Sequence, residues 1–194
     1  MVNGTTHEVT GLSAGTSYYY RLRSENASGV SSNSNEIETI TIPDEPVENN
    51  ATSVTQSSFT ANWEATTGAA SYRLDVSEES DFSTYLFGYP MFGITDTEQS
   101  VTGLIAGTTY YYRVFASNTS GTSGSSSSVE TITIPSNPVS QEGTNITSTS
   151  FDANWVVVFG STGYKLDVSA TSDFSTFVSG YEDRSVSGIS ESVT

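Results

Sequence analysis

The chain repeats itself with a period of 92 residues. Residues 9–42 match residues 101–134 at 21 of 34 positions without a gap, and residues 43–102 match residues 135–194 at 26 of 60 positions. A period of this length corresponds to a small β-sandwich domain rather than to the unit of a solenoid, which has about 20–45 residues. The repeat therefore predicts consecutive modules of one fold.

The phase of the repeat sets the expected domain boundaries. Residues 43–134 make one complete module, while residues 1–42 supply the C-terminal half of a module and residues 135–194 the N-terminal half of a further one. A few strands cannot bury both faces of a core, so each half is expected to need a partner. Either the sequence is a window of a longer array, or the two halves complement each other. The halves of successive copies are expected to join head-to-tail, and the competing arrangement pairs the two halves of one chain in a closed monomer.

Alternation of apolar and polar residues predicts the strands of the complete module. The clearest alternation runs over residues 59–63 and 72–76. Shorter strands are expected around 85–87, just before Gly103, across 110–115 and across 131–134. No segment has an apolar period of 3.6 residues, so helix should be almost absent. The fold class indicated is an all-β antiparallel sandwich.

The same alternation predicts which side chains face the core. In the triplet of residues 110–112 the two outer tyrosines should face inward and Tyr111 outward, and residues 18–20 should behave in the same way with Tyr19 outward. In the last strand, which should end at Pro135, Ile132 and Ile134 alternate with threonines and are expected on the apolar face.

Three groups of residues resemble the core pattern of the fibronectin type III family. These are a tryptophan in the second strand, a Tyr-x-Leu-x-Val third strand, and Leu-x-x-Gly-Thr-x-Tyr before the sixth strand. The resemblance spans the chain and implies tandem fibronectin type III-like (immunoglobulin-like) sandwiches. The last motif is similar to a tyrosine corner, in which the hydroxyl bonds to the turn backbone. The implied core residues are Trp63, Trp155, Tyr72, Tyr164, Tyr18 and Tyr110.

A second resemblance concerns the amino-acid sequence of one segment of the repeat. The run Leu-Asp-Val-Ser-x-x-Ser-Asp-Phe-Ser-Thr occurs at residues 74–84 and again at 166–176. It is similar to the tandem modules of large secreted bacterial surface proteins. That resemblance implies a protein outside the cell or on its surface.

Composition excludes several classes of protein. The chain has no cysteine, a single histidine (His7), and 6 basic against 22 acidic residues, for a net charge of −16. Thiolate metal sites and cysteine nucleophiles are therefore absent, and nucleic acid is not expected as a partner. No apolar run reaches the roughly 20 residues of a membrane span. No catalytic constellation stands out, so an enzyme is not expected.

Two acidic loops are the candidate metal sites. Residues 75–81 and 167–173 carry carboxylate and hydroxyl oxygens, which are the ligands that Ca²⁺ prefers. The candidate ligands are Asp75, Asp81, Asp167 and Asp173. The alternative is a structural turn in which aspartate and serine bond their own backbone, and no other cofactor is expected.

Asn26 and Asn118 begin sequons in equivalent loops of successive modules. In a secreted protein they are candidate glycosylation sites. The alternative is that they are ordinary turn residues.

Three roles follow from this sequence. The first is a non-catalytic extracellular stalk or filament of modules, whose partners are copies of itself. The second is an adhesin or carbohydrate-binding accessory module that contacts glycans or a cell surface, for which Tyr19 and Tyr111 are the outward aromatic residues. The third is a spacer in a larger secreted enzyme. Proline-flanked joints at residues 41–46 and 133–138 favour the first role, because proline stiffens a connection.

Overall fold

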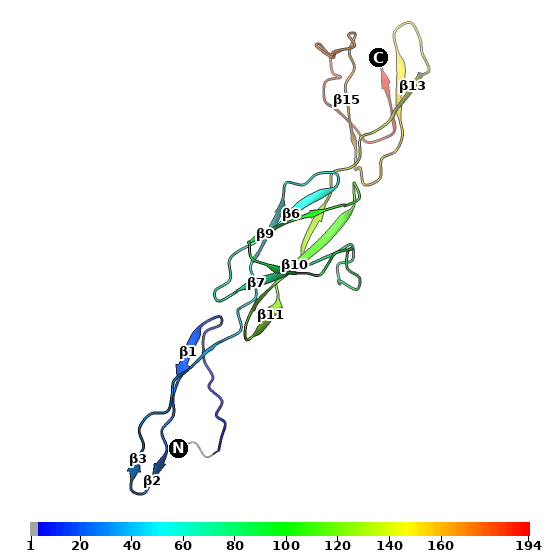
Figure 1. The fold of residues 1–194 in the computed structure, drawn as a ribbon. Helices are drawn as coiled ribbons and strands as arrows, with labels where there is room; N and C mark the ends of the chain where they lie inside the picture. Colours follow the sequence, from blue (N-terminus) through cyan, green and yellow to red (C-terminus); the bar gives the residue numbers. More distant parts are fainter. Residues whose placement is uncertain (1–3) are drawn as a thin grey trace. The chain divides into compact units, whose positions relative to one another are not determined.

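The computed structural model describes residues 4–194, and these residues form strands, turns and loops without a helix (Figure 1). The all-β class expected from the sequence is thereby confirmed. The chain forms two compact units, and each is described by itself. One unit comprises Met1–Ser53, Phe59–Val101 and Thr109–Thr131, and the other comprises Val54–Ser58, Thr102–Thr108 and Ile132–Thr194.

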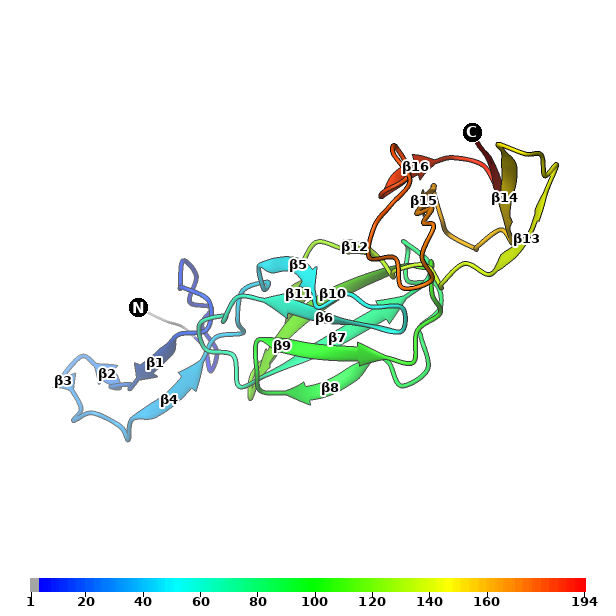
Figure 2. The same cartoon turned by 90° about the horizontal axis from the view of Figure 1, so that it is seen from above.

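Residues 43–134 contain two sheets (Figure 2). The first has the order β5-β6-β9, with β5 at Glu48–Thr52, β6 at Ser58–Trp63 and β9 at Glu98–Thr102. The second has the order β11-β10-β7-β8, and β12 also pairs with β10. Its strands are β7 (Ser71–Ser77), β8 (Met91–Ile94), β10 (Thr109–Asn118), β11 (Gly121–Ser125) and β12 (Val129–Ile132).

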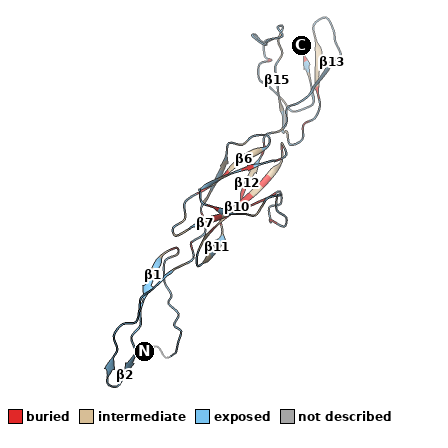
Figure 3. Ribbon diagram, in the orientation of Figure 1, coloured by how far each residue is buried: buried red, intermediate tan, exposed pale blue. Residues whose placement is uncertain are grey.

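The core lies where the two sheets face each other. Phe59 of β6 has its ring 5.8 Å from Tyr112 and 6.4 Å from Tyr110 of β10, and both tyrosines are fully buried. Buried residues are found along β10 (Figure 3). Trp63 is 3% exposed, and its ring lies 5.5 Å from that of Tyr72. Burying each such side chain contributes about 1.5–3 kcal/mol, so alternate residues of the central strands hold the sandwich together.

The last strand is oriented differently from the sequence expectation. Ile132 and Ile134 are 53% and 50% exposed, whereas Thr133 is buried. The Thr133 hydroxyl donates to the carbonyl oxygen of Ile105 at 2.7 Å and accepts from the N–H of Thr108 at 3.0 Å. The Thr133 hydroxyl thus bonds two backbone groups of the preceding turn, which favours threonine at the inner position. The expectation that the isoleucines face the core was wrong.

The strand expected at residues 85–87 is also wrong. Residues 85–87 lie in a loop, and the edge strand is β8, where Ile94 pairs with Tyr72 and Met91 with Leu74. Gly88 adopts a φ of 90° and Pro90 has no amide hydrogen, so the ladder cannot run through residues 88–90. The chain resumes pairing only after the proline.

Residues 17–40 form one long, interrupted antiparallel hairpin. β1 (Ser17–Tyr20) pairs with β4 (Ile37–Ile40), and nearer the tip β2 (Glu25–Asn26) pairs with β3 (Gly29–Val30). Tyr20, expected in the core, is 54% exposed, and Tyr18 is half-buried. In the complete module the equivalent tyrosines are covered by β6 and β7, which have no counterpart within residues 4–42.

Residues 135–194 form two further sheets. β13 (Ser140–Thr144), β14 (Phe151–Trp155) and β17 (Ser190–Val193) pair in the order β13-β14-β17, and β15 (Tyr164–Leu166) pairs with β16 (Arg184–Val186). Trp155 is 7% exposed, and its ring lies 5.4 Å from that of Tyr164. The tryptophan–tyrosine pair of the complete module thus recurs here at nearly the same distance.

Candidate functional site

Asp75 is a fully buried carboxylate on the face of β7 that points away from the sandwich core. Its Oδ1 lies 2.9 Å from Nε of Arg73, and its Oδ2 lies 3.0 Å from Nε of Arg113 on the neighbouring strand. The pairing of β7 with β10 sets Arg113 directly opposite Asp75. The carboxylate that the sequence predicted as a calcium ligand is therefore paired with two guanidinium groups.

Aromatic rings cover these two arginines. The guanidinium carbon of Arg73 lies 3.6 Å from the centroid of Phe115, and that of Arg113 lies 4.1 Å from the centroid of Phe82. Such contacts are attractive because the ring face is negative. We call this set the arginine–aromatic face; its members are Arg73, Asp75, Phe82, Tyr85, Phe92, Arg113 and Phe115.

Sequence reasoning missed the arginine–aromatic face. The signal was present, because Arg113 lies in its strand between Tyr112 and Val114, which were expected to face the core, so that Arg113 must point to the opposite side. Phe92 is 69% exposed and Tyr85 is 44% exposed, so the rim of this face is open to solvent. Residues 135–194 carry lysine and arginine at the positions of Arg73 and Phe92, so the face is not repeated.

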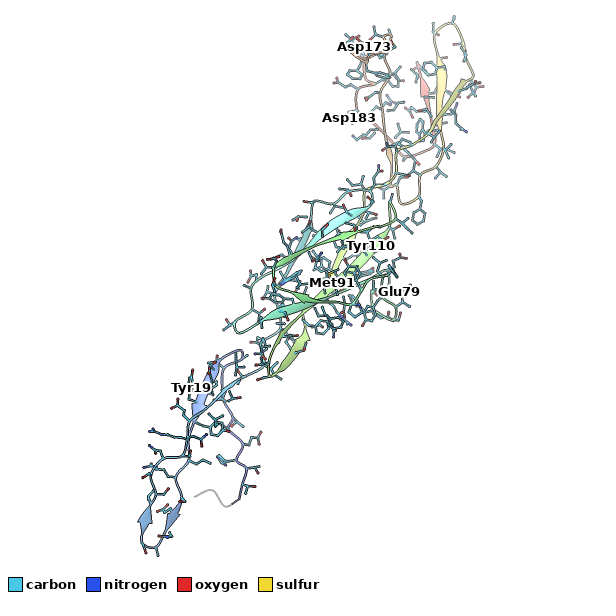
Figure 4. The ribbon with its side chains drawn as sticks, viewed as in Figure 1. Tyr19, Glu79, Met91, Tyr110, Asp173 and Asp183 are labelled. Atoms are coloured by element: carbon cyan, nitrogen blue, oxygen red, sulfur yellow. The ribbon has the colours of Figure 1, made fainter. Side chains whose placement is uncertain are left out.

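The other three calcium candidates bind backbone groups. Oδ1 of Asp81 accepts the N–H of Ser83 at 2.9 Å, and this bond, with the Ser83 hydroxyl, holds the pKa of Asp81 below its usual value. Asp173 accepts the N–H of Ser175 at 3.1 Å, which lowers its pKa in the same way (Figure 4). Asp167 accepts the N–H of Asp183. Within residues 4–194 no three His, Asp or Glu side chains are grouped as metal ligands.

The two sequon asparagines have different surroundings. Asn118 donates from Nδ2 to the carbonyl oxygen of Thr41 at 2.8 Å and to that of Gly68 at 3.2 Å. Asn26 is exposed, and the contact described for its side chain is an acceptance from the N–H of Ser28 at 2.8 Å. Equivalent sequence positions thus serve different roles.

The outward tyrosines also differ. Tyr19 is 61% exposed on β1 (Figure 4), and a hydrogen bond to Glu38 raises its pKa. Tyr111 is half-buried in its sheet. His7 is exposed. Residues 4–194 hold no helix with the length and hydropathy needed to cross a bilayer.

The joints between successive modules share one backbone contact. In the first unit, Gly15 packs against the loop that follows β6, so closely that a Cβ at Gly15 would overlap the carbonyl oxygen of Thr67 and a Cβ at Gly68 would overlap Gly15. In the second unit, Gly107 packs in the same way against Phe159 and Gly160. The two contacts are 92 residues apart.

Comparison with known proteins assigns the complete module to a family. Residues 44–132 match the sequence model of the Fibronectin type III domain. Residues 44–132 form a fibronectin type III domain. The matched range lies inside the module expected at 43–134, and its two sheets and buried tryptophan agree with that assignment.

One curated relative covers most of the chain. Chitinase A1 of Niallia circulans is 31% identical in an alignment 181 residues long, and the alignment covers 84% of this chain and 24% of the chitinase. The chain thus spans about a quarter of the length of that relative.

Among solved structures, the crystal structure of FN3tt is 26% identical, with a TM-score of 0.40, and covers 49% of this chain and 98% of its own. The sixth fibronectin type III domain of human fibronectin type III domain containing protein 3 is 25% identical, with a TM-score of 0.44. It covers 54% of this chain and 97% of its own.

Proposed function

We propose that this chain is a non-catalytic spacer of an extracellular protein, in which successive β-sandwich modules hold other parts of the protein, or other copies, at a set separation. The observation that carries the proposal is the repeated joint contact, Gly15 on Gly68 in one unit and Gly107 on Gly160 in the other. A contact that returns with the period of the module fixes each module against the next. A spacer requires this property, whereas a binding site does not.

The residues of the first joint, 41–46, support the same role. Pro43 and Pro46 are buried, and the N–H of Gly15 donates to the carbonyl oxygen of Ile42 at 2.9 Å. Proline fixes φ, so the connection loses little entropy when it is ordered. A semi-rigid connection transmits the orientation of one module to the next.

The relative supports a place within a larger secreted protein. Its shared region is most of this chain but about a quarter of the chitinase. A module that accompanies an enzyme, or that repeats into a stalk of head-to-tail copies, fits this proportion. We propose neither a catalytic residue nor a cofactor. The buried carboxylate of Asp75 is paired with arginines, Asp81 and Asp173 cap turns, and Asp167 accepts the N–H of Asp183.

The experiment is a test for turnover and binding on polysaccharides. The purified chain is incubated with chitin oligosaccharides and with insoluble chitin and cellulose, and products and sedimented protein are measured. We expect no products and no depletion of the chain from the supernatant. Sustained release of oligosaccharide by the purified chain would overturn the proposal.

A second function is favoured by the arginine–aromatic face. Exposed aromatic rings beside guanidinium groups can stack on sugar rings and bond their hydroxyls, and Phe92 is the most exposed member of the face. The same sedimentation assay tests this function. Binding that Phe92→Ala abolishes would establish it. Phe159→Ala is the matched control, because Phe159 is 73% exposed and lies outside this face.

A further inference from the structure

The turn between β10 and β11 is built around one asparagine. Asn118 accepts the N–H of Ser120 on its Oδ1 at 2.9 Å, which fixes the side chain within the turn. Its Nδ2 then points outward and donates both hydrogens, to the carbonyl oxygens of Thr41 and Gly68. Thr41 belongs to the end of the preceding module, and Gly68 belongs to the loop that receives Gly15.

Two neighbours in the same turn contact the same strand end. The hydroxyl of Ser120 donates to the carbonyl oxygen of Ile40. The side chain of Ile42 covers Gly121, where a Cβ would lie 2.9 Å from Cδ1 of Ile42. Residues 40–42 are thus held to one four-residue turn by the amide of Asn118, the hydroxyl of Ser120 and the contact of the Ile42 side chain with Gly121.

Residues 26–29 provide an internal comparison. Their sequence, Asn-Ala-Ser-Gly, matches Asn-Thr-Ser-Gly at residues 118–121, and Asn26 accepts the N–H of Ser28 at 2.8 Å. The turn is therefore formed in the same way in both modules. The bonds from Nδ2 of Asn118 cannot be required to form the turn, because the exposed turn at Asn26 forms with no preceding strand end among residues 4–42.

We propose that the Asn-x-Ser-Gly turn is an interaction surface whose partner is the last strand of the preceding module, and that Asn118 and Ser120 lock the first joint by binding residues 40–42. The lock deepens the proposed spacer role, because it adds side-chain bonds to the glycine contact. A glycan on Nδ2 of Asn118 would remove one of its two donated hydrogens. Asn118 is therefore a joint residue rather than a glycan acceptor.

The experiment replaces the amide without disturbing the turn. Asn118→Asp keeps an oxygen for the N–H of Ser120 but sets a second oxygen against the carbonyl oxygens of Thr41 and Gly68. Asn26→Asp makes the same chemical change in the turn that holds no strand end. Amide hydrogen exchange of the full chain is followed by mass spectrometry in peptides that cover residues 38–46.

The expected result is faster exchange in residues 38–46 of Asn118→Asp by about fivefold, the effect of losing about 1 kcal/mol. Asn26→Asp should leave that exchange unchanged. Equal exchange in all three proteins, or equal acceleration by both variants, would overturn the inference.

If Asn118→Asp also accelerates exchange in β6, the variant has loosened the module itself, and the lock is then tested with Ser120→Ala. Faster exchange confined to residues 38–46 supports the lock, and unchanged exchange there overturns it. This measurement does not depend on polysaccharide turnover, so the lock and the spacer role can fail separately.

Discussion

Single side chains stabilise this fold in two distinct environments. Between the sheets, Trp63 packs on Tyr72 and is almost without solvent contact. On the outer face, Asp75 is just as buried, but its surroundings are two guanidinium groups and the rings that cover them. Substitutions that remove apolar volume should destabilise the first environment, and substitutions that remove charge should destabilise the second.

Trp63→Ala is expected to lower the free energy of unfolding of the complete module by about 3–5 kcal/mol, since it opens a cavity between the sheets. Trp63→Phe should lower it less, because it keeps an aromatic ring and removes an indole N–H that is buried without a partner. Urea unfolding followed by circular dichroism measures both variants. A loss below about 1 kcal/mol for Trp63→Ala would contradict the described core.

Asp75→Asn is expected to cost on the order of 3 kcal/mol, because it leaves Arg73 and Arg113 without their buried counter-charge. Asp167→Asn, the equivalent change in residues 135–194, should cost far less, since Asp167 is there hydrogen-bonded to a backbone N–H. The same urea titration compares the two. Similar, small effects of both variants would show that the arginine pairs contribute nothing measurable.

At the scale of elements, the turn before β1 and the loop after β6 form the first joint. Gly15 has a φ of 57° and lies against the backbone of the loop, so it is restricted both by its own conformation and by its neighbour. Gly11 lies in the same turn with a φ of 76° but has open space where a Cβ would lie. Comparing substitutions of the two glycines therefore distinguishes the effect of backbone strain from the effect of packing in the joint.

Gly15→Ala is expected to accelerate hydrogen exchange in both residues 64–70 and residues 40–43, because the added methyl group must push the loop away. Gly11→Ala should carry a similar conformational cost but should leave hydrogen exchange in residues 64–70 and 40–43 unchanged. A joint that exchanges equally in both variants would mean that the glycine contact does not hold the modules together.

Much of the fold follows from alternation, but some orientations do not. The inward residues of β6, β7 and β10 were predictable because a sandwich strand buries every second side chain. The inward position of Thr133 was not, because two backbone groups of a turn select a hydroxyl there. The exposure of Tyr20 depends on which strands are present to cover it. Of the candidate sites, the carboxylate of Asp75 was identified, but its arginine partners, Arg73 on the same strand and Arg113 on the neighbouring strand, were not.

At the scale of the whole molecule, the repeat makes the chain a series of modules. The net charge of −16 discourages contact between separate copies in solution, so contacts between modules depend on residues built into each joint. The chain has no cysteine, and spin labels can therefore be placed at chosen sites without removing a native thiol.

The most direct test of the spacer account is the distribution of distances across the first joint. Thr39→Cys on β4 and Ser100→Cys on β9 are exposed positions of the same compact unit, and a spin label on each is measured by pulsed electron paramagnetic resonance. A semi-rigid joint should give one narrow distribution, which broadens in Asn118→Asp and in Gly15→Ala. A broad distribution in the unaltered joint, typical of a flexible tether, would contradict it.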